Sequence, residues 1–307
     1  MTFTRSRNRA DQPSRRGFLA APLLAAMPAM AANRITRSRV SAITDEIARS
    51  PEGAIEFAKQ YGLEWLELRS VPGGRKEYFQ LSEAELREAA KQFRDAGVKI
   101  SFLNTSMLKY AMPGAVNPNP QRRWDVSRFE KRQQELEQSI AAARILGVNK
   151  VRVFTFLRAA DREQQIPKVA EILNQMAETA AKEKIHLLIE NEGACNVATC
   201  GELVELLKQV PSKWLGINWD PLNAANKQEV AFPDGYNMLP NKRIQNVQIK
   251  GRSILPGPQL MDWAEIFRRL EKDGYKGQVG LETHIFGEIQ VQKSHESIRE
   301  ILRLVTS

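Results

Sequence analysis

Residues 185–220, IHLLIENEGACNVATCGELVELLKQVPSKWLGINWD, contain one complete unit of the pattern that decides the fold. Apolar runs at 185–190 and 215–220 each end on an acidic residue, and a helical stretch lies between them. Thr199 and Glu202 have the spacing of a capping box, which marks the start of that helix. Runs that are apolar almost throughout are typical of strands covered on both faces. The unit therefore predicts two parallel strands joined by a helix.

The same unit repeats along most of the chain. Further strands are predicted at 40–44, 63–68, 98–103, 150–155, 244–250 and 278–282. The helices between them have recognisable ends, with starts at Ser50-Pro51, Ser82 with Glu85, and Asp262 with Glu265, and stops at Gly62, Gly97, Gly147 and Gly274. Eight such units predict a (β/α)8 TIM barrel that occupies residues 33–307 as one domain. An open doubly wound sheet is the alternative, but no G-x-G-x-x-G turn follows the first strand.

The first 32 residues differ in composition from the rest. Arg15 and Arg16 precede an apolar run over 18–32, which includes the small-x-small site Ala29-Met30-Ala31. This order resembles a bacterial twin-arginine export signal. We therefore expect residues 1–32 to be a signal peptide read by the twin-arginine translocase, and the mature protein to be periplasmic or extracellular. The alternative is a basic disordered tail beside a stray amphipathic helix.

Composition and charge exclude several classes of protein. Hydrophobic residues make up 42% of the chain, which is too many for global disorder, and two cysteines cannot form a disulfide scaffold. The net charge of +9 suggests nucleic acid, but residues 1–32 carry five arginines against one aspartate. Much of the excess therefore lies in the predicted leader, and we expect no nucleic-acid partner. No other stretch approaches membrane-spanning length, so we expect no stable membrane insertion of the mature chain.

Acidic residues end three of the late strands. Glu190, Asp220 and Glu282 follow apolar runs, and the strand at 244–250 carries Gln248. Because the carboxyl ends of parallel strands meet at one rim of a barrel, we expect these side chains to lie together. Three neighbouring carboxylates would raise one another's pKa, and a divalent cation removes that repulsion. An all-oxygen set that includes the Gln248 amide favours a hard ion, Mn²⁺ or Mg²⁺.

The segments around these residues resemble the sugar phosphate isomerase/epimerase family, which are xylose isomerase-like TIM barrels. The resemblance rests on LIEN at 188–191, WDPLN at 219–223, VQIK at 247–250 and LETH at 281–284. It implies one divalent metal held by Glu190, Asp220, the residue at position 248 and Glu282. It also implies that Glu190 and Glu282 act as the acid–base pair that moves a proton through an enediolate.

This sequence departs from the family pattern at three positions. The family's third metal ligand is histidine, where this chain has Gln248; a neutral amide oxygen is a weaker ligand, and we expect a lower affinity for Zn²⁺. Family members often carry histidine where this chain has Glu192 and Asn223. We expect both of these residues to contact substrate.

Other polar residues are candidates for the pocket. Lys250 lies two residues beyond Gln248, on the same side of its strand, and is expected to bind substrate or an oxyanion, unless it is a solvated strand-end lysine. His284 follows Glu282 by two and is expected to bind substrate at the mouth. Arg152, and Glu67 with Arg69, are either pocket residues or members of a buried salt bridge.

The resemblance implies a metal-dependent isomerase or epimerase with a carbohydrate substrate, and export favours an unphosphorylated sugar or keto-sugar. Two alternatives stay open: a lyase that performs β-elimination on 3-keto-glycosides, and a non-catalytic sugar-binding barrel, for which the glutamine at 248 is the main argument. A DNA-repair nuclease also uses this barrel but needs several histidines, and this chain has three. Such families are often dimers or tetramers, which leaves a homo-oligomer as an option.

Overall fold

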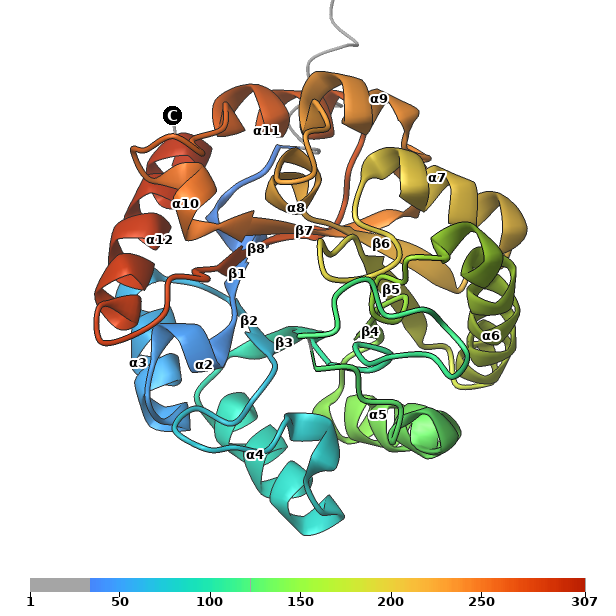
Figure 1. The fold of residues 1–307 in the computed structure, drawn as a ribbon. Coiled ribbons are helices and arrows are strands. Elements are labelled where there is room, and N and C mark those ends of the chain that lie inside the picture. Colours follow the sequence, from blue (N-terminus) through green and yellow to red (C-terminus); the bar gives the residue numbers. More distant parts are fainter. Residues whose placement is uncertain (1–33, 122, 307) are drawn as a thin grey trace, which may run out of the picture.

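The computed structural model describes residues 34–121 and 123–306, in which eight parallel strands form a ring surrounded by helices (Figure 1). The strands are β1 Val40–Ala42, β2 Trp65–Leu68, β3 Lys99–Leu103, β4 Lys150–Val153, β5 His186–Glu190, β6 Leu215–Trp219, β7 Ile244–Lys250 and β8 Gln278–Glu282. The predicted (β/α)8 barrel is confirmed, with several strands one or two residues shorter than the apolar runs that predicted them. The predicted leader, residues 1–32, lies outside the described residues.

The strand order shows how the barrel closes. Each strand from β2 to β7 pairs in parallel with the strand that follows it in the sequence, and β8 pairs in parallel with β1. Only one residue pair, Ile43 with Glu67, bridges the ends of β1 and β2. The register aligns Gln248 with Gly280 and Lys250 with Glu282. All carboxyl ends therefore meet at one rim, as parallel barrels require.

Helices follow the strands, and four of them end within two residues of the predicted stops at Gly62, Gly97, Gly147 and Gly274. The helices are α2 Thr44–Ile47, α3 Pro51–Tyr61, α4 Glu83–Asp95, α5 Arg132–Leu146, α6 Arg162–Lys182, α7 Cys200–Gln209, α8 Pro221–Ala225, α9 Tyr236–Met238, α10 Gly251–Ile254, α11 Trp263–Lys272 and α12 Gln290–Thr306. The capping boxes at Ser82 and Thr199 are both formed, and Ser50 accepts a hydrogen bond from the Gly53 amide. Gly62 ends α3 at φ 62°, a conformation that favours glycine. No helix among the described residues is long and apolar enough to cross a membrane.

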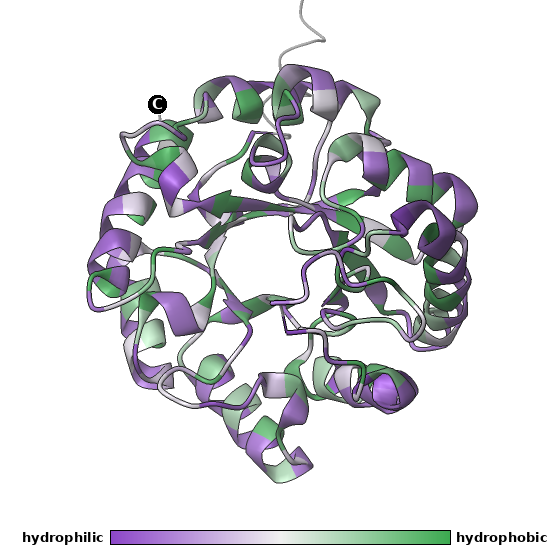
Figure 2. Ribbon diagram, viewed as in Figure 1, coloured by the Kyte–Doolittle hydropathy of each residue, from purple (hydrophilic) through white to green (hydrophobic). Residues whose placement is uncertain are grey.

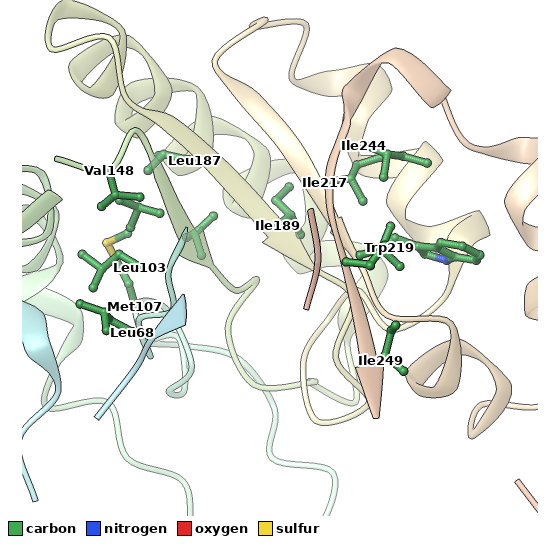
Figure 3. Packing of buried hydrophobic residues seen from close by; sticks show 14 of the residues in the cluster. Leu68, Leu103, Met107, Val148, Leu187, Ile189, Ile217, Trp219, Ile244 and Ile249 are labelled. Atoms are coloured by element: carbon green, nitrogen blue, oxygen red, sulfur yellow. The ribbon is translucent and has the colours of Figure 1, made fainter. Parts of the chain in front are cut away.

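The core lies between the strands and the helices. On β5 and β6, Leu187, Ile189, Ile217 and Trp219 are fully buried and belong to one hydrophobic cluster (Figure 3). The outer helices alternate hydrophobic and hydrophilic residues along their length, with the apolar ones available to cover this surface (Figure 2). The other face of the strands is different, because polar side chains there meet one another across the barrel. That polar interior positions the site.

The segment after β6 is more structured than the sequence predicts. A long loop with a short turn is expected over 223–241, whereas the structure has α8, a helical turn at Ala231–Gly235 and α9. Trp219 packs its ring against Tyr236 of α9, at 5.1 Å between ring centres, so it supports these short helices from behind the strand.

Candidate metal centre and active site

Three buried carboxylates meet at the carboxyl rim of the barrel. Glu190 is the last residue of β5, Asp220 directly follows β6 and Glu282 is the last residue of β8. One oxygen atom from each lies within 4.8 Å of the others, and none of the three residues is more than 4% exposed. Residues that are about 30 to 90 positions apart in the sequence therefore form one acidic cluster, as their strand-end positions predict.

Glu190 forms one ion pair, with Arg152. The Arg152 guanidinium of β4 donates to Glu190 Oε2 at 2.9 Å, and the Asn218 side-chain amide donates to the same atom at 2.9 Å. Burial nevertheless raises the pKa of Glu190 to about 7, because the negative charge of Glu282 offsets part of the field of Arg152. The carboxyl group can therefore hold or release a proton near neutral pH.

Glu282 has more positive charge around it. Arg69 donates to its Oε1 at 3.0 Å, and the Lys250 ammonium lies 3.8 Å from its Oε2. Burial acts to raise the pKa of Glu282, but Lys250, Arg69 and Arg152 together outweigh burial and lower it to about 2. Glu282 is therefore ionised at neutral pH.

Lys250 is enclosed by the cluster rather than solvated. It is 4% exposed, its Nζ lies 3.0 Å from Asp220 Oδ2, and it donates to Asn223 Oδ1 at 2.6 Å. Burial opposes its charge, but Asp220, Glu282 and other acids outweigh burial and raise its pKa. The alternative of a solvated strand-end lysine is wrong. Burial also raises the pKa of Asp220, against the field of Lys250.

Further charged groups surround the cluster. Arg69 binds Asp45 and Glu46 at 2.8 Å each, and Lys109 binds Glu192 at 2.8 Å. With Lys250 and Arg152 this makes four cationic side chains against six carboxylates at the mouth: Asp45, Glu46, Glu190, Glu192, Asp220 and Glu282. The mouth is therefore a dense set of charges in which acidic side chains outnumber basic ones.

The oxygen atoms of the cluster fit a hard cation. The side-chain oxygen of Gln248 on β7 is buried and accepts no hydrogen bond, whereas Asp220 Oδ2 and Glu282 Oε2 face Lys250 Nζ at 3.0 and 3.8 Å. Buried acceptors without partners are costly, and a hard divalent ion prefers oxygen ligands of these types. The donor set of Glu190, Asp220, Gln248 and Glu282 therefore suits a divalent metal, although Lys250 lies against two of the same oxygens.

The predicted substrate residues lie at the same mouth. Asn223 donates to the Asn191 carbonyl as well as accepting from Lys250, so it is held on two sides. His284 has a φ of 48°, its backbone amide donates to Glu46, and its half-buried ring meets the exposed ring of Phe286 edge-on. Arg152 forms the salt bridge with Glu190 that the sequence offered as one of its two roles.

Three charged residues of the mouth were not predicted from the sequence. Asp45 and Glu46 follow β1, so the rule that acids at strand ends meet at the rim would have found them had it been extended to the first strand. Lys109 lies in the long connection between β3 and α5, where no periodic pattern or motif marks it. Its position against Glu192 is visible only in three dimensions.

A cavity also lies at the opposite end of the barrel. It has a volume of about 570 Å³ and is lined by the residues that begin β4, β5, β7 and β8, among them Lys150 and His186. Lys150 donates to Gln278 Oε1 at 2.6 Å, and the one carboxylate of this lining, Asp273, already accepts from the Tyr236 hydroxyl. It contains none of the predicted site residues, so the chemistry is assigned to the carboxyl rim.

Comparison with known proteins agrees with this architecture. Residues 55–305 match the family model described as xylose isomerase-like TIM barrel. The structure is similar to 3-keto-D-glucoside 4-epimerase from E. coli (14% identity, 88% of this chain and 100% of that one, TM-score 0.65) and to a probable 3-DHS dehydratase from Bacillus anthracis (19%, 88% and 99%, 0.64). It is also similar to the IolI protein with a bound zinc atom (14%, 87% and 96%, 0.66). No curated protein matches the chain.

Proposed function

Since the chain belongs to the xylose isomerase-like TIM barrel family, we propose that it is a divalent-metal-dependent isomerase or epimerase of an unphosphorylated sugar or keto-sugar. The observation that carries the proposal is the buried cluster of Glu190, Asp220 and Glu282, in which one oxygen of each carboxylate lies within 4.8 Å of the others. The likeness to a keto-sugar epimerase supports the substrate class.

The two glutamates are suited to opposite steps of a proton transfer. Glu282 is ionised and takes the proton from the carbon beside the substrate carbonyl, while Glu190, with a pKa of about 7, returns a proton. Environments that push the pKa values of two neighbouring carboxyls apart are typical of an acid–base pair. A substrate oxygen that attracts Lys250 would also remove positive charge from Glu282 and make it a stronger base.

Other residues hold the pair and the substrate in place. A divalent cation bound by Glu190, Asp220, Gln248 and Glu282, with Mn²⁺ or Mg²⁺ preferred for these oxygen ligands, would stabilise the negative charge that develops on a substrate oxygen. Arg152 keeps Glu190 in position through its hydrogen bond. Asn223, Lys250, Glu192 and His284 line the mouth where sugar hydroxyls would be recognised.

The charges of the mouth favour a substrate without phosphate. Each of the four cationic side chains there already has a carboxylate within 4 Å: Arg69 with Glu282, Lys109 with Glu192, Arg152 with Glu190 and Lys250 with Asp220. A phosphate group would have to displace one of these carboxylates. Neutral sugar hydroxyls, by contrast, can donate to the carboxylates as well as accept from the cations.

A lyase is the second candidate, because the structure is also similar to a dehydratase. The same removal of a proton by Glu282 would begin β-elimination on a 3-keto-glycoside, with Glu190 protonating the departing oxygen. The products separate the two reactions, since an epimerase returns an isomer and a lyase releases the aglycone.

Solvent deuterium exchange tests the proposed function. The protein is incubated with Mn²⁺ in D₂O with a panel of ketoses and 3-keto-glycosides, and deuterium incorporation and products are followed by NMR. We expect Glu190→Gln and Glu282→Gln each to lower exchange by about 10²- to 10⁴-fold, the usual contribution of a general acid or base. The exposed Glu88→Gln serves as control. Unchanged exchange in both active-site variants contradicts the assignment, and binding without exchange in the wild type favours a sugar-binding barrel.

The proposal includes export, because residues 1–32 have the order of a twin-arginine signal. Replacement of both Arg15 and Arg16 by lysine should keep the protein in the cytoplasm, as measured by cell fractionation. Appearance of this variant outside the cytoplasm at the wild-type level would contradict it.

A further inference from the structure

Glu67 of β2 is a buried carboxylate inside the barrel without a cationic partner. It is 0% exposed, and no lysine or arginine of residues 34–121 and 123–306 forms an ion pair with it. Hydrogen bonds take the place of a cation. Its oxygens accept from the Ser41 hydroxyl at 2.7 Å and from the side-chain amides of Asn104 at 2.8 Å, Gln248 at 2.8 Å and Asn246 at 3.3 Å.

The space for this carboxylate depends on a glycine in β8. A Cβ atom at Gly280 would lie 1.9 Å from Glu67 Oε1, well inside any contact distance. Gly280 has an ordinary strand conformation, so the absence of a side chain there serves close approach and not a special backbone angle. Gly280 is also the register partner of Gln248. Glu67 therefore reaches the β7–β8 pair through a gap that only glycine leaves open.

Three side-chain amides around Glu67 have the same orientation, with nitrogen toward the carboxylate. Asn104, Asn246 and Gln248 each point the side-chain nitrogen at the carboxylate, and in each the side-chain oxygen is buried without a hydrogen-bond partner. An ionised carboxylate can only accept, so an amide turned the other way would place oxygen against oxygen. All three amides are thus oriented as donors to Glu67.

We propose that Glu67 is a positioning residue that holds the Gln248 amide with its oxygen, and not its nitrogen, available as the ligand atom. This inference rests on the proposed function, in which Gln248 takes part in the metal site. A carboxylate that fixes the orientation of a metal ligand is the usual arrangement for histidine ligands, and here the ligand is an amide. Without Glu67, Gln248 is free to present its NH₂ group, which repels a cation.

A chain of hydrogen bonds also connects Glu67 on β2 to Glu190 on β5. Asn246 donates to Glu67 Oε1 and to Asn218 Oδ1 at 3.0 Å, and Asn218 donates to Glu190 Oε2 at 2.9 Å. The donated hydrogen bonds therefore run outward from Asn246, on one side to Glu67 and on the other through Asn218 to Glu190. The carboxylate that orients Gln248 thus also orients Asn246, whose hydrogen bond helps Asn218 to face Glu190 as a donor.

The test measures Mn²⁺ affinity by calorimetry in the wild type, Glu67→Gln, Gln248→Leu and the double variant. Glu67→Gln has the same shape but can donate, so we expect Mn²⁺ to bind about 10- to 100-fold more weakly. In the Gln248→Leu background the same change should have little further effect, because Glu67 acts through Gln248. The exposed Glu64→Gln, three residues before Glu67, is the matched control and should bind as the wild type does.

A second measurement on metal-free protein separates this inference from the proposed function. With ¹⁵N-glutamine labelling, the side-chain amide signal that disappears in Gln248→Leu should exchange slowly with solvent in the wild type and shift in Glu67→Gln. Fast exchange of that signal overturns the inference, even if Glu67→Gln does not fold. An equal loss of Mn²⁺ affinity with and without Gln248 overturns it as well. A wild type that binds no Mn²⁺ but shows the protected amide overturns the metal function alone.

Discussion

Glu190 and Glu282 come from two neighbouring walls of one mouth, β4–β6 and β7–β8, with carboxylate oxygens within 4.8 Å of each other, yet their environments differ in charge. On the β4–β6 wall, Glu190 has Arg152 and a neutral amide, and burial raises its pKa to about 7. On the β7–β8 wall, Glu282 is buried to a similar extent, but Lys250 and Arg69 lower its pKa to about 2.

The comparison shows that burial alone does not set the proton affinity of these groups. Both carboxyls lose nearly all contact with water, which disfavours the charged form of each. The number of cations near each carboxyl group then decides whether its protonated or its ionised form is favoured at neutral pH. Two identical side chains thereby become a proton donor and a proton acceptor, and the following changes test this difference.

The largest expected effect is loss of the cation that pairs with Glu190. At pH 8, Arg152→Met should destabilise the protein by about 3–5 kcal/mol, because an ionised, buried carboxylate is left without its partner. Chemical denaturation measures the change, and the exposed Arg87→Met, which removes a surface ion pair, is the control. A cost no larger than that of the control would contradict the comparison.

A smaller effect concerns the dependence of stability on pH. The raised pKa of Glu190 means that the folded state binds more protons than the unfolded state between about pH 4.5 and 7, so its contribution is fully present below that window and is lost as pH rises through it. Glu282 has the opposite sign, and its contribution is lost as pH falls from about 4.5 toward 2.

The measurement is the free energy of unfolding from pH 5 to 8 with a chelator present. The wild type should lose roughly 1–3 kcal/mol more stability over this range than Glu190→Gln, since each pKa unit is worth about 1.4 kcal/mol. Parallel curves for the two proteins would show that Glu190 titrates normally.

The smallest effect concerns Lys250, whose ammonium lies against the oxygens of Asp220 and Glu282 that would hold a metal. Lys250→Met removes this competing charge, and Mn²⁺ affinity should rise about tenfold, or about 1.4 kcal/mol. Calorimetry measures the change, and the exposed Lys213→Met should leave affinity unaltered. Weaker binding in Lys250→Met would mean that the lysine assists the metal.

Much of the fold could be predicted because its signals are local. Thr199 with Glu202, Ser82 with Glu85 and the positive-φ Gly62 mark helix ends through contacts within a few residues. The acidic cluster could also be predicted, because parallel strands bring their carboxyl ends together whatever the details of packing. Lys109 could not, since its place beside Glu192 depends on the path of an irregular connection between β3 and α5.

The amino-acid sequence by itself determined the eight strand–helix units, the rim at which Glu190, Asp220 and Glu282 gather, and the oxygen-rich character of that rim. Only the tertiary structure decided which carboxylate each cation faces and that Lys250 is buried among acidic groups. It also decided that Glu67 reaches Gln248, through the space left by the missing side chain of Gly280, and orients its amide. Strand periodicity and caps are encoded over a few neighbouring residues. Burial and charge pairing depend on distances between atoms that lie far apart along the chain.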